Sequence, residues 1–455
     1  MNYIAPSLES LPVESLLTAE FDVNPGAVYQ RLRSTYGQVA PVDLAGVPVW
    51  LVLGYQEVLD VLRDEHTWKR DIRHWRARAE GRLPRDWAPL AAHEVRQTMF
   101  LDGAEHRAAR QTFHAALSPF QDSRTPQGRE LRAAVVRYAD ELVGALAAEA
   151  GPVGFADLNA QYTRPLMLMI VSRLFGFPED VGEEVVVDLW HLLDAGPDAA
   201  EATGRALEAM TRVAAHCRAR PGEDVTSGML AADPSLTDEQ LGREIFANAL
   251  FLSDATGNMI LATLLETLTS GSGGVLAAAP STGLIGDLVN RVGLINPPTA
   301  NLTFRFPAHD VRLGNFRLLA GDTVVPSLAA AHQDLMTFGG ADAASRAHLA
   351  WGAGPHQCPG AAHALADTIV AVAVGRICEH FARAETTLPP NQLPWRAGPV
   401  SRGLRGLPVR YELKATGPAR GGAGAPAALG GSPAADRGPK GPLAALRRMM
   451  FGSRR

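Results

Sequence analysis

The feature that most constrains this chain is a glycine-rich loop that ends in a cysteine, Trp351-Gly-Ala-Gly-Pro-His-Gln-Cys-Pro-Gly360. It lies between a β-prone region and a long helical pattern. Gly352 and Gly354 let the backbone turn tightly and bring amide groups near the Cys358 sulfur. A helix that begins just after Cys358 would direct its positive end at the sulfur, which lowers the pKa of the thiol. The loop therefore predicts a rigid, shielded thiolate that binds a metal, with His356 in reach of an anionic group on a cofactor.

Two other interpretations of Cys358 stay open at this point, an inert buried cysteine and the nucleophile of a hydrolase. No histidine and asparagine or aspartate context marks the second of these. Cys217 and Cys378 lie inside helical patterns and are expected to be inert core residues. Three widely spaced cysteines argue against a disulfide framework and favour a reducing, cytosolic setting.

Charge and hydropathy exclude two classes of protein. With 43 basic and 48 acidic residues, the net charge of −5 gives no global basic field, so nucleic-acid binding is not expected as the main role. Residues 1–20 carry three glutamates and no long apolar run, so they predict neither a signal peptide nor a membrane anchor. No stretch approaches the roughly 18 to 20 uninterrupted apolar residues that span a bilayer. We expect a soluble protein without an integral membrane anchor.

The hydrophobic patterns predict a mainly α protein with a small β portion, folded as a single domain. A buried central helix is expected where a long pattern is apolar on most faces and has small polar residues midway. The expected elements are a hairpin or two edge strands at 41–54, a helix at 55–64, long helices within 127–270 that include the central helix at about 243–270, short strands within 302–326 and a final helix at about 360–384.

The ends of the chain differ in composition from its middle. We expect residues 1–20 to form an N-terminal extension, 21–413 the globular domain and 414–455 a disordered Gly/Ala/Pro-rich tail. The tail ends in a short basic and hydrophobic patch at 442–455. Two interpretations of this patch stay open: a solvated tail, and a weak docking or membrane-surface segment.

Two further motifs carry cations in patterns that suit carboxylate partners. His106 and Arg110 are four residues apart, so one helix face presents both. Alone, such a pair is more often a solvated surface pair. Arg305 lies in a β-prone run, Asn301-Leu-Thr-Phe-Arg-Phe-Pro307.

These motifs together resemble bacterial, actinobacterial-type cytochromes P450, from about residue 20 to 412. The loop from Trp351 to Gly360 is similar to their haem-binding loop, with Trp351 at a position that is usually Phe. The resemblance implies the cytochrome P450 fold and haem b, with Cys358 as the axial ligand of the iron. It also implies these cofactor-binding residues: His106, Arg110, Arg305 and His356 on the propionates, and Trp351 and Gly352 in the loop.

The central helix departs from the proton-delivery motif of this family. Alignment on Asn258-Met259-Ile260 places Asp254 at the acid and Ala255 at the position of the usual threonine, with Thr256 one residue later. A local bulge would present Thr256 instead. We therefore take Asp254 and Thr256 as the candidate catalytic residues, while a buried acid satisfied by neighbouring backbone is the alternative for Asp254.

The second departure concerns a structural Glu-x-x-Arg ion pair that the family carries before its Pro-Pro. Counting back from Pro297-Pro298 gives Arg291 and Leu294, and counting by the helix gives Asp287 and Asn290. Neither choice is the expected pair. Its loss questions the rigidity of the region near the haem more than the chemistry.

The resemblance implies a cytoplasmic monooxygenase that oxidises a small hydrophobic, secondary-metabolite type of substrate. Electrons would come from a separate ferredoxin and ferredoxin reductase. Two alternatives stay open. One is non-insertion chemistry such as oxidative coupling, dehydration or a peroxide-driven reaction, and the other is a non-catalytic haem protein that binds a partner enzyme.

Overall fold

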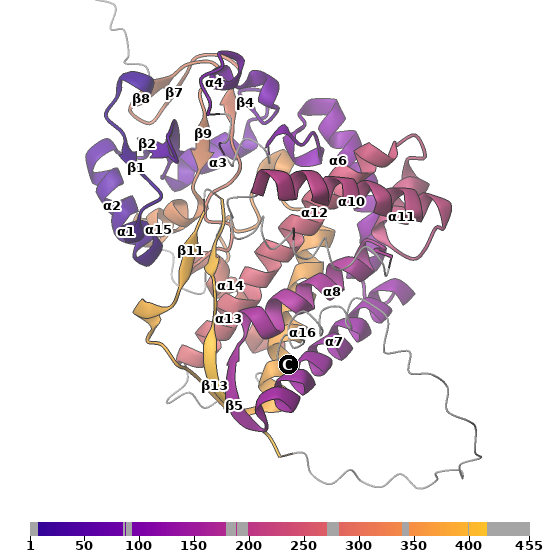
Figure 1. Ribbon diagram of the computed structural model, residues 1–455. Coiled ribbons are helices and arrows are strands. Elements are labelled where there is room, and N and C mark those ends of the chain that lie inside the picture. Colours follow the sequence, from indigo (N-terminus) through magenta and orange to yellow (C-terminus); the bar gives the residue numbers. More distant parts are fainter. Residues whose placement is uncertain are drawn as a thin grey trace, which may run out of the picture.

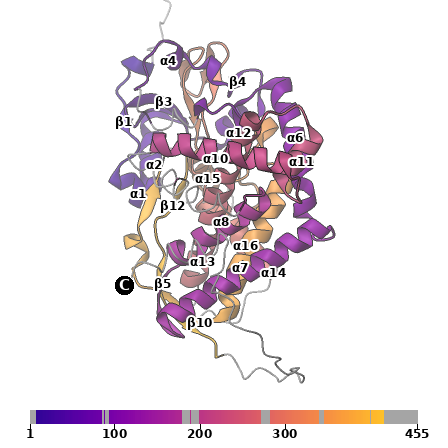
Figure 2. The same cartoon turned by 45° about the vertical axis from the view of Figure 1, so that its right-hand side comes forward.

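The computed structural model describes residues 8–84, 87, 93–178, 188, 199–270, 282–338, 345–398 and 400–415. A helical part and a smaller β-rich part lie side by side (Figures 1 and 2). This agrees with the mainly α fold that the sequence predicts. Of the tail expected at 414–455, residues 416–455 lie outside the described residues, so their state stays a prediction, while Lys414 donates hydrogen bonds to the His380 and Cys378 carbonyl oxygens.

The helical part is built around one large hydrophobic core. Each long helix contributes one apolar face or more to this core, as the Ala/Leu/Val-rich patterns predict. Its helices are α6 (Gly103–Gln121), α7 (Pro126–Ala150), α8 (Arg164–Leu174), α10 (Ala199–Ala219), α11 (Val225–Ala232), α12 (Asp238–Phe251), α13 (Gly257–Ser270), α14 (Thr282–Ile295) and α16 (Gly360–His380).

The central helix changes its backbone hydrogen-bonding pattern midway, from α-helix to a π-turn and back to α-helix. It begins at a capping box, in which the Thr237 hydroxyl accepts from the Gln240 amide and the Gln240 side chain accepts from the Thr237 amide. Between α12 and α13 the residues Leu252–Thr256 form a π-turn. The sequence predicts this buried helix. It also allows a local bulge that would present Thr256 in place of the usual threonine, and the π-turn is such a bulge.

The β-rich part contains a four-stranded sheet in the order β1-β2-β3-β9. Ala45 and Gly46 both have positive φ, 54° and 89°, as a two-residue hairpin turn between β2 and β3 requires. The strands are β1 (Glu14–Ser15), β2 (Val39–Leu44), β3 (Val47–Val52) and β9 (Val324–Pro326). The hairpin expected at 41–54 is confirmed.

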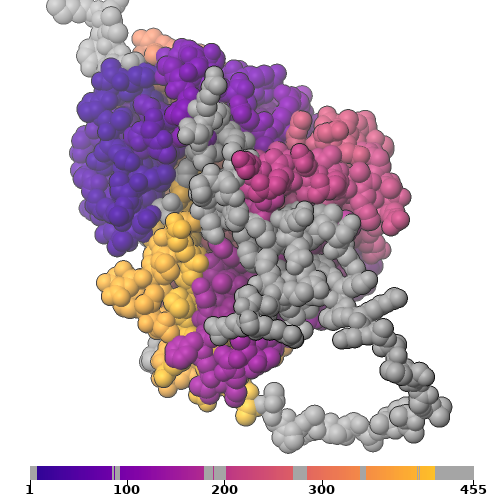
Figure 3. Space-filling model, in the orientation of Figure 1, coloured from indigo at the N-terminus to yellow at the C-terminus, as the bar shows by residue number. Residues whose placement is uncertain are grey.

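Short helices cover this sheet, and smaller strand pairs join it to the helical part. The helices are α1 (Ala19–Val23), α2 (Pro25–Tyr36), α3 (Tyr55–Arg63), α4 (Arg76–Ala79) and α15 (Leu328–Phe338). The smaller pairs are β4 (Trp68–Lys69) with β6 (Phe306–Pro307), β7 (Val311–Leu313) with β8 (Phe316–Leu318), and β11 (Trp395–Ala397) with β12 (Arg402–Leu404). The N-terminal α1 contacts β11, so segments from the first and last parts of the chain are neighbours at the surface (Figure 3).

The final helix is shorter than the sequence suggests. It ends at His380, because Phe381 begins β10 (Phe381–Thr386), which pairs with β13 (Pro408–Leu413) in the sheet β10-β13-β5. The strand β5 (Val153–Asp157) completes this sheet. Pairing with a strand distant in sequence overrides the helical pattern here.

Two helical stretches, Asp238–Thr269 and Gly360–His380, are long and apolar enough to cross a membrane by composition. More than half of each apolar window is buried inside the protein, 61% and 56%. Packing in the core accounts for this apolarity without a membrane.

Candidate functional site

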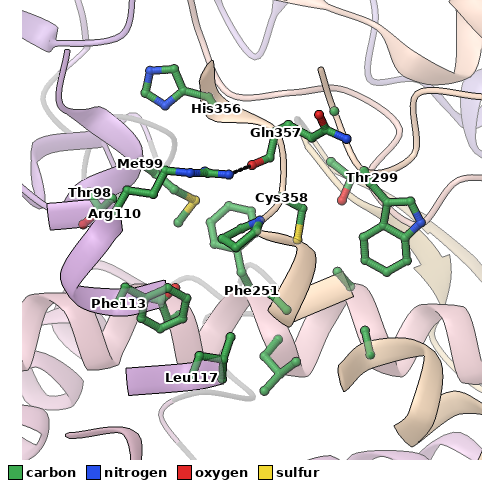
Figure 4. A pocket seen from close by; sticks show the side chains of 18 of the residues that line it. Thr98, Met99, Arg110, Phe113, Leu117, Phe251, Thr299, His356, Gln357 and Cys358 are labelled. Atoms are coloured by element: carbon green, nitrogen blue, oxygen red, sulfur yellow. Dashed lines mark hydrogen bonds between the residues drawn. The ribbon is translucent and has the colours of Figure 1, made fainter. Parts of the chain in front are cut away.

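A cavity of about 240 Å³ opens where the cysteine loop faces the central helix (Figure 4). Figure 4 shows the Cys358 sulfur pointing toward the helix that carries Phe251. The walls are largely apolar, as in most sites for small organic ligands. The apolar side chains are Met99, Phe113, Leu117, Leu174, Phe175, Phe251, Leu252, Leu302, Leu365 and Val400.

The cysteine loop has the rigid geometry that its glycines predict. Gly352 and Gly354 have φ of 72° and 71°, in the region that favours glycine. A Cβ on Gly354 would lie 2.2 Å from the carbonyl oxygen of Leu62, so only glycine fits between this loop and α3. The Cys358 amide donates to the Trp351 carbonyl oxygen over 2.9 Å. The loop is closed on itself, with the thiol at its inner face.

The environment of the Cys358 thiol corrects one expectation. Burial raises its pKa to about 11, although the nearby Arg110 opposes this effect. The helix α16 begins two residues later, at Gly360. A bound metal cation would favour the thiolate against this effect of burial.

The four cations named from the sequence gather on one side of this loop. His106 and Arg110 come from α6, Arg305 from a bridge to β9, and His356 from the loop itself. The rings of His106 and His356 stack with centroids 3.8 Å apart. Arg110 donates to the Gln357 carbonyl oxygen. Residues that are 250 positions apart in the chain thus form one site.

A fifth cation, Arg70, belongs to the same cluster and was not identified from the sequence. It follows β4, lines the cavity and is 6% exposed. Its guanidinium donates to the Thr303 hydroxyl, and it lies 5.7 Å from the centre of the Phe100 ring. The only signal in the sequence is an arginine just after a short aromatic β-prone run, which is too common to identify a site. We define Arg70, His106, Arg110, Arg305 and His356, three arginines and two histidines that carry a charge only when protonated, as the cation cluster.

The cation cluster has unmet capacity for an anion. Among the residues that the structure describes, neither Arg70 nor Arg305 forms an ion pair, although both are buried. Arg70 Nε and His106 Nδ1 are buried and have no hydrogen-bond partner. Asp102 is the nearest acid, but its carboxylate accepts from the backbone amides of Arg70 and Asp71.

The pKa values of the cluster also indicate that its basic groups lack anionic partners. Burial lowers the pKa of Arg70 well below its usual range and that of Arg305 to about 10. Burial and Arg110 lower the pKa of His106 to about 4, and burial and Arg70 lower that of His356 strongly. Anionic ligand oxygens would reverse these shifts. The cluster beside Cys358 therefore fits a metal-bearing ligand with carboxylates, as haem is.

The central helix presents Thr256, not Asp254, to the cavity. The π-turn places Ala255 and Thr256 in the cavity wall. The Asp254 carboxylate instead accepts from Arg396 of β11 over 2.7 Å and from Asn258 over 3.1 Å. It is not one of the lining residues. A direct role for Thr256 is compatible with this geometry, while Asp254 would first have to leave Arg396.

Another buried acid on this helix, Glu244, was not identified from the sequence. Its Oε1 accepts from the Thr98 amide over 2.7 Å, and its Oε2 is buried without a partner. Burial raises its pKa to about 7, against the effect of the Thr98 amide. Glu244 thus ties the central helix to the segment Thr98–Phe100, which forms one wall of the cavity.

This pKa predicts how Glu244→Gln changes stability with pH. The folded protein holds a proton that the unfolded chain, with a pKa near 4.5, releases, so the folded state loses stability as pH rises through this range. Glu244→Gln should be close to neutral at about pH 5 and should stabilise by up to about 3 kcal/mol at about pH 8. Urea unfolding at both pH values measures this. Glu239→Gln, an exposed change on the same helix, should give no gain at the higher pH.

The helix α14 replaces the expected Glu-x-x-Arg ion pair by uncharged contacts. Asn290 donates to the Ser345 carbonyl oxygen over 3.2 Å, and its Oδ1 lies 3.2 Å from His348 Nε2. His332 lies 3.0 Å from the Leu294 carbonyl oxygen and accepts from the Leu349 amide over 2.7 Å. These contacts join α14 to the segment that leads into the cysteine loop.

Asn290→Ala should therefore loosen the cysteine loop. Loss of its two half-buried contacts is expected to lower the free energy of unfolding by about 1–2 kcal/mol. Chemical unfolding measures the change. Asp287→Ala removes only an exposed ion pair with Arg346 on the same helix and should change stability by less than about 0.5 kcal/mol. Equal effects of the two variants would contradict a structural role of the uncharged contacts.

We compared the whole chain with known proteins. No family model matches the chain. It is 28% identical over 415 residues to the cytochrome P450 monooxygenase PikC of Streptomyces venezuelae, covering 87% of this chain and 93% of PikC. It is 27% identical over 414 residues to 2-hydroxy-5-methyl-1-naphthoate 7-hydroxylase of Streptomyces carzinostaticus, covering 86% and 96%.

Solved structures show the same fold. The ligand-free P450 monooxygenase TamI superposes with a TM-score of 0.70 at 25% sequence identity, covering 88% of this chain and 94% of TamI. PikC and a further relative, cytochrome P450 107B1 of Saccharopolyspora erythraea, are named as cytochromes P450 of bacteria, and TamI is named as a P450 monooxygenase.

Proposed function

Because its fold and its relatives make this chain a bacterial cytochrome P450, we propose that it is a monooxygenase of a small hydrophobic secondary metabolite. The observation that carries this proposal is the Cys358 sulfur at the wall of an apolar cavity, next to the cation cluster, in which Arg70 and Arg305 are buried without an ion pair among the described residues. The fold and the relatives support an oxidoreductase of this family. The substrate class and the redox partner are further parts of this proposal.

The residues of this chain would hold haem b in two ways. Cys358 would bind the iron, and the cation cluster would donate to the two propionates. Trp351 and Gly352 line the cavity next to Cys358 and would contact the macrocycle. The haem-thiolate supplies activation of dioxygen with two electrons and two protons.

The other side of the cavity would exclude water and deliver protons. Phe251, Leu252 and Phe113 keep bulk water from the reacting position. Thr256, in the wall at the π-turn, would hold a proton donor near that position. The Asp254 carboxylate, held by Arg396 and Asn258, would take up a proton from water and pass it toward Thr256 when its ion pair opens.

The nature of the substrate and partner is argued by similarity. PikC and the naphthoate hydroxylase are named for a monooxygenase and an aromatic hydroxylase activity. A cavity with mostly apolar walls is compatible with an apolar polyketide-like or aromatic compound. We propose a ferredoxin with its reductase as the electron source, as the family resemblance implies.

Turnover with a surrogate ferredoxin system tests the proposal. NADPH consumption should rise on addition of a substrate, and an oxygenated product should appear. Thr256→Val should keep most NADPH consumption but divert it to hydrogen peroxide, lowering product per NADPH by about tenfold or more, since general acid catalysis contributes roughly a hundredfold to ten-thousandfold. Product and peroxide are measured together. Unchanged coupling in Thr256→Val would assign proton delivery elsewhere, and no substrate-dependent consumption would contradict the monooxygenase.

A second candidate is haem chemistry without oxygen insertion, such as oxidative coupling. The ion pair of Asp254 with Arg396 favours it, because an acid engaged there delivers protons less readily. Labelled dioxygen separates the two: a monooxygenase places one labelled oxygen atom in the product, and a coupling reaction places none.

A further inference from the structure

One polar side chain of the cavity has an open hydrogen-bond acceptor. Asn248 lies on α12 and lines the cavity near Phe251 and Leu252. Its Nδ2 donates to the Glu244 carbonyl oxygen over 2.8 Å, which fixes the orientation of the amide. The Asn248 side chain also interacts with the Glu244 carboxyl group, and no hydrogen bond to its Oδ1 is formed within the residues that the structure describes. The amide oxygen is therefore the group of Asn248 that is available to a ligand.

The surroundings of Asn248 hold this acceptor in place. One helical turn earlier, Glu244 binds the Thr98 amide and so joins α12 to the opposite wall of the cavity. Glu244 is 7% exposed and does not itself line the cavity. A ligand would thus meet a neutral amide oxygen on a rigid helix, in walls that are otherwise mainly apolar.

Asn248 lies at a fixed distance along the central helix from the π-turn. The π-turn Leu252–Thr256 packs against α16, the helix that follows Cys358. Asn248 precedes Ala255 by seven residues, which is about 10 Å along a helix. Asn248 and the π-turn residues Ala255 and Thr256 thus line the same cavity about two helical turns apart.

We propose that Asn248 Oδ1 accepts a hydrogen bond from a neutral hydroxyl group of the substrate, about two helical turns before the cavity residues Ala255 and Thr256. This rests on the proposed function, and it names the chemical class of the substrate: an apolar molecule with a remote alcohol or phenol. An ammonium group would be buried against an uncharged oxygen, which is costly without an ionised partner in the wall. A substrate carboxylate would place its own acceptor oxygen against Asn248 Oδ1, with no hydrogen between them to form a hydrogen bond.

Binding of decanol and decyl methyl ether to the haem-loaded protein tests the proposal. The two probes have the same apolar chain, but only the alcohol donates a hydrogen bond. Dissociation constants are read from the Soret shift of the ferric protein and, independently of the haem band, by calorimetry. The wild-type protein should prefer the alcohol by about fivefold, the effect of one net hydrogen bond.

Variants assign that preference to Asn248. Asn248→Leu, which keeps the volume, should remove the preference and leave the ether constant unchanged. Asn248→Asp retains an acceptor and should keep the preference. Thr299→Val removes a different polar group of the same cavity and should have no effect. A preference that survives Asn248→Leu, or one lost in Thr299→Val, overturns the proposal. Absence of a haem-thiolate spectrum would contradict the proposed function instead, and calorimetry would still decide the role of Asn248.

Discussion

Cys358→Ala is expected to remove the red-shifted carbon monoxide band of the dithionite-reduced protein and to abolish substrate oxidation completely. Cys358 is the cysteine in the cavity wall, at the inner face of a closed loop. Thiolate donation to the iron is what gives this band and favours cleavage of the oxygen–oxygen bond. The difference spectrum measures the first effect, and product formation with a surrogate ferredoxin measures the second.

Two other cysteines provide matched controls. Cys217 and Cys378 are free and buried away from the cavity, and burial raises the pKa of each thiol, to about 12 and about 11. Cys217→Ala and Cys378→Ala should lower stability modestly, by about 1 kcal/mol, and leave the spectrum unchanged. A band that persists in Cys358→Ala, or disappears in a control, would contradict Cys358 as the iron ligand.

The sequence predicts the parts of the fold whose cause is local. The hairpin around Ala45-Gly46 follows from alternating apolar residues with a tight turn, and the structure has β2 and β3 there. The helix expected at 55–64 is α3, Tyr55–Arg63. The end of α16 at His380 could not be predicted, because it depends on the pairing of Phe381 with Leu413.

The candidate site divides in the same way. The loop around Cys358 carries its glycines and its cysteine within ten residues, so local sequence is sufficient to identify it. Arg70 and Asn248 acquire their significance only from burial and from neighbours that are distant in sequence. The π-turn lies between these cases: the misplaced threonine suggests a bulge, but only the folded helix shows Thr256 in the cavity wall.

Arg70→Met is expected to have opposite effects on the protein without and with its cofactor. Without haem, Arg70 is a buried charge with no ion pair among the described residues and an unpaired Nε. Its replacement by an apolar side chain of similar length should therefore raise the free energy of unfolding of the apoprotein, by about 1–3 kcal/mol. With haem, loss of a charged donor to a propionate should weaken binding on the order of tenfold to a hundredfold.

The opposite directions of these two effects, a more stable apoprotein and weaker haem binding, distinguish a cofactor-binding arginine from a structural one. Urea unfolding of the apoprotein gives the first effect, and the rate of haem transfer to apomyoglobin gives the second. Arg107→Met is the matched control, because Arg107 is exposed on α6 and pairs only with Glu65, so both measurements should stay within error. A structural arginine would destabilise the apoprotein when removed. If Arg70→Met lowers the stability of the apoprotein and leaves haem transfer unchanged, the cation cluster does not include Arg70 as a propionate donor.

Arg305 is 3% exposed and equally without an ion pair among the described residues. Arg305→Met should therefore also raise the stability of the apoprotein and weaken haem binding. Agreement between these two positions, 235 residues apart in the chain, would be hard to explain by anything except a shared anionic ligand.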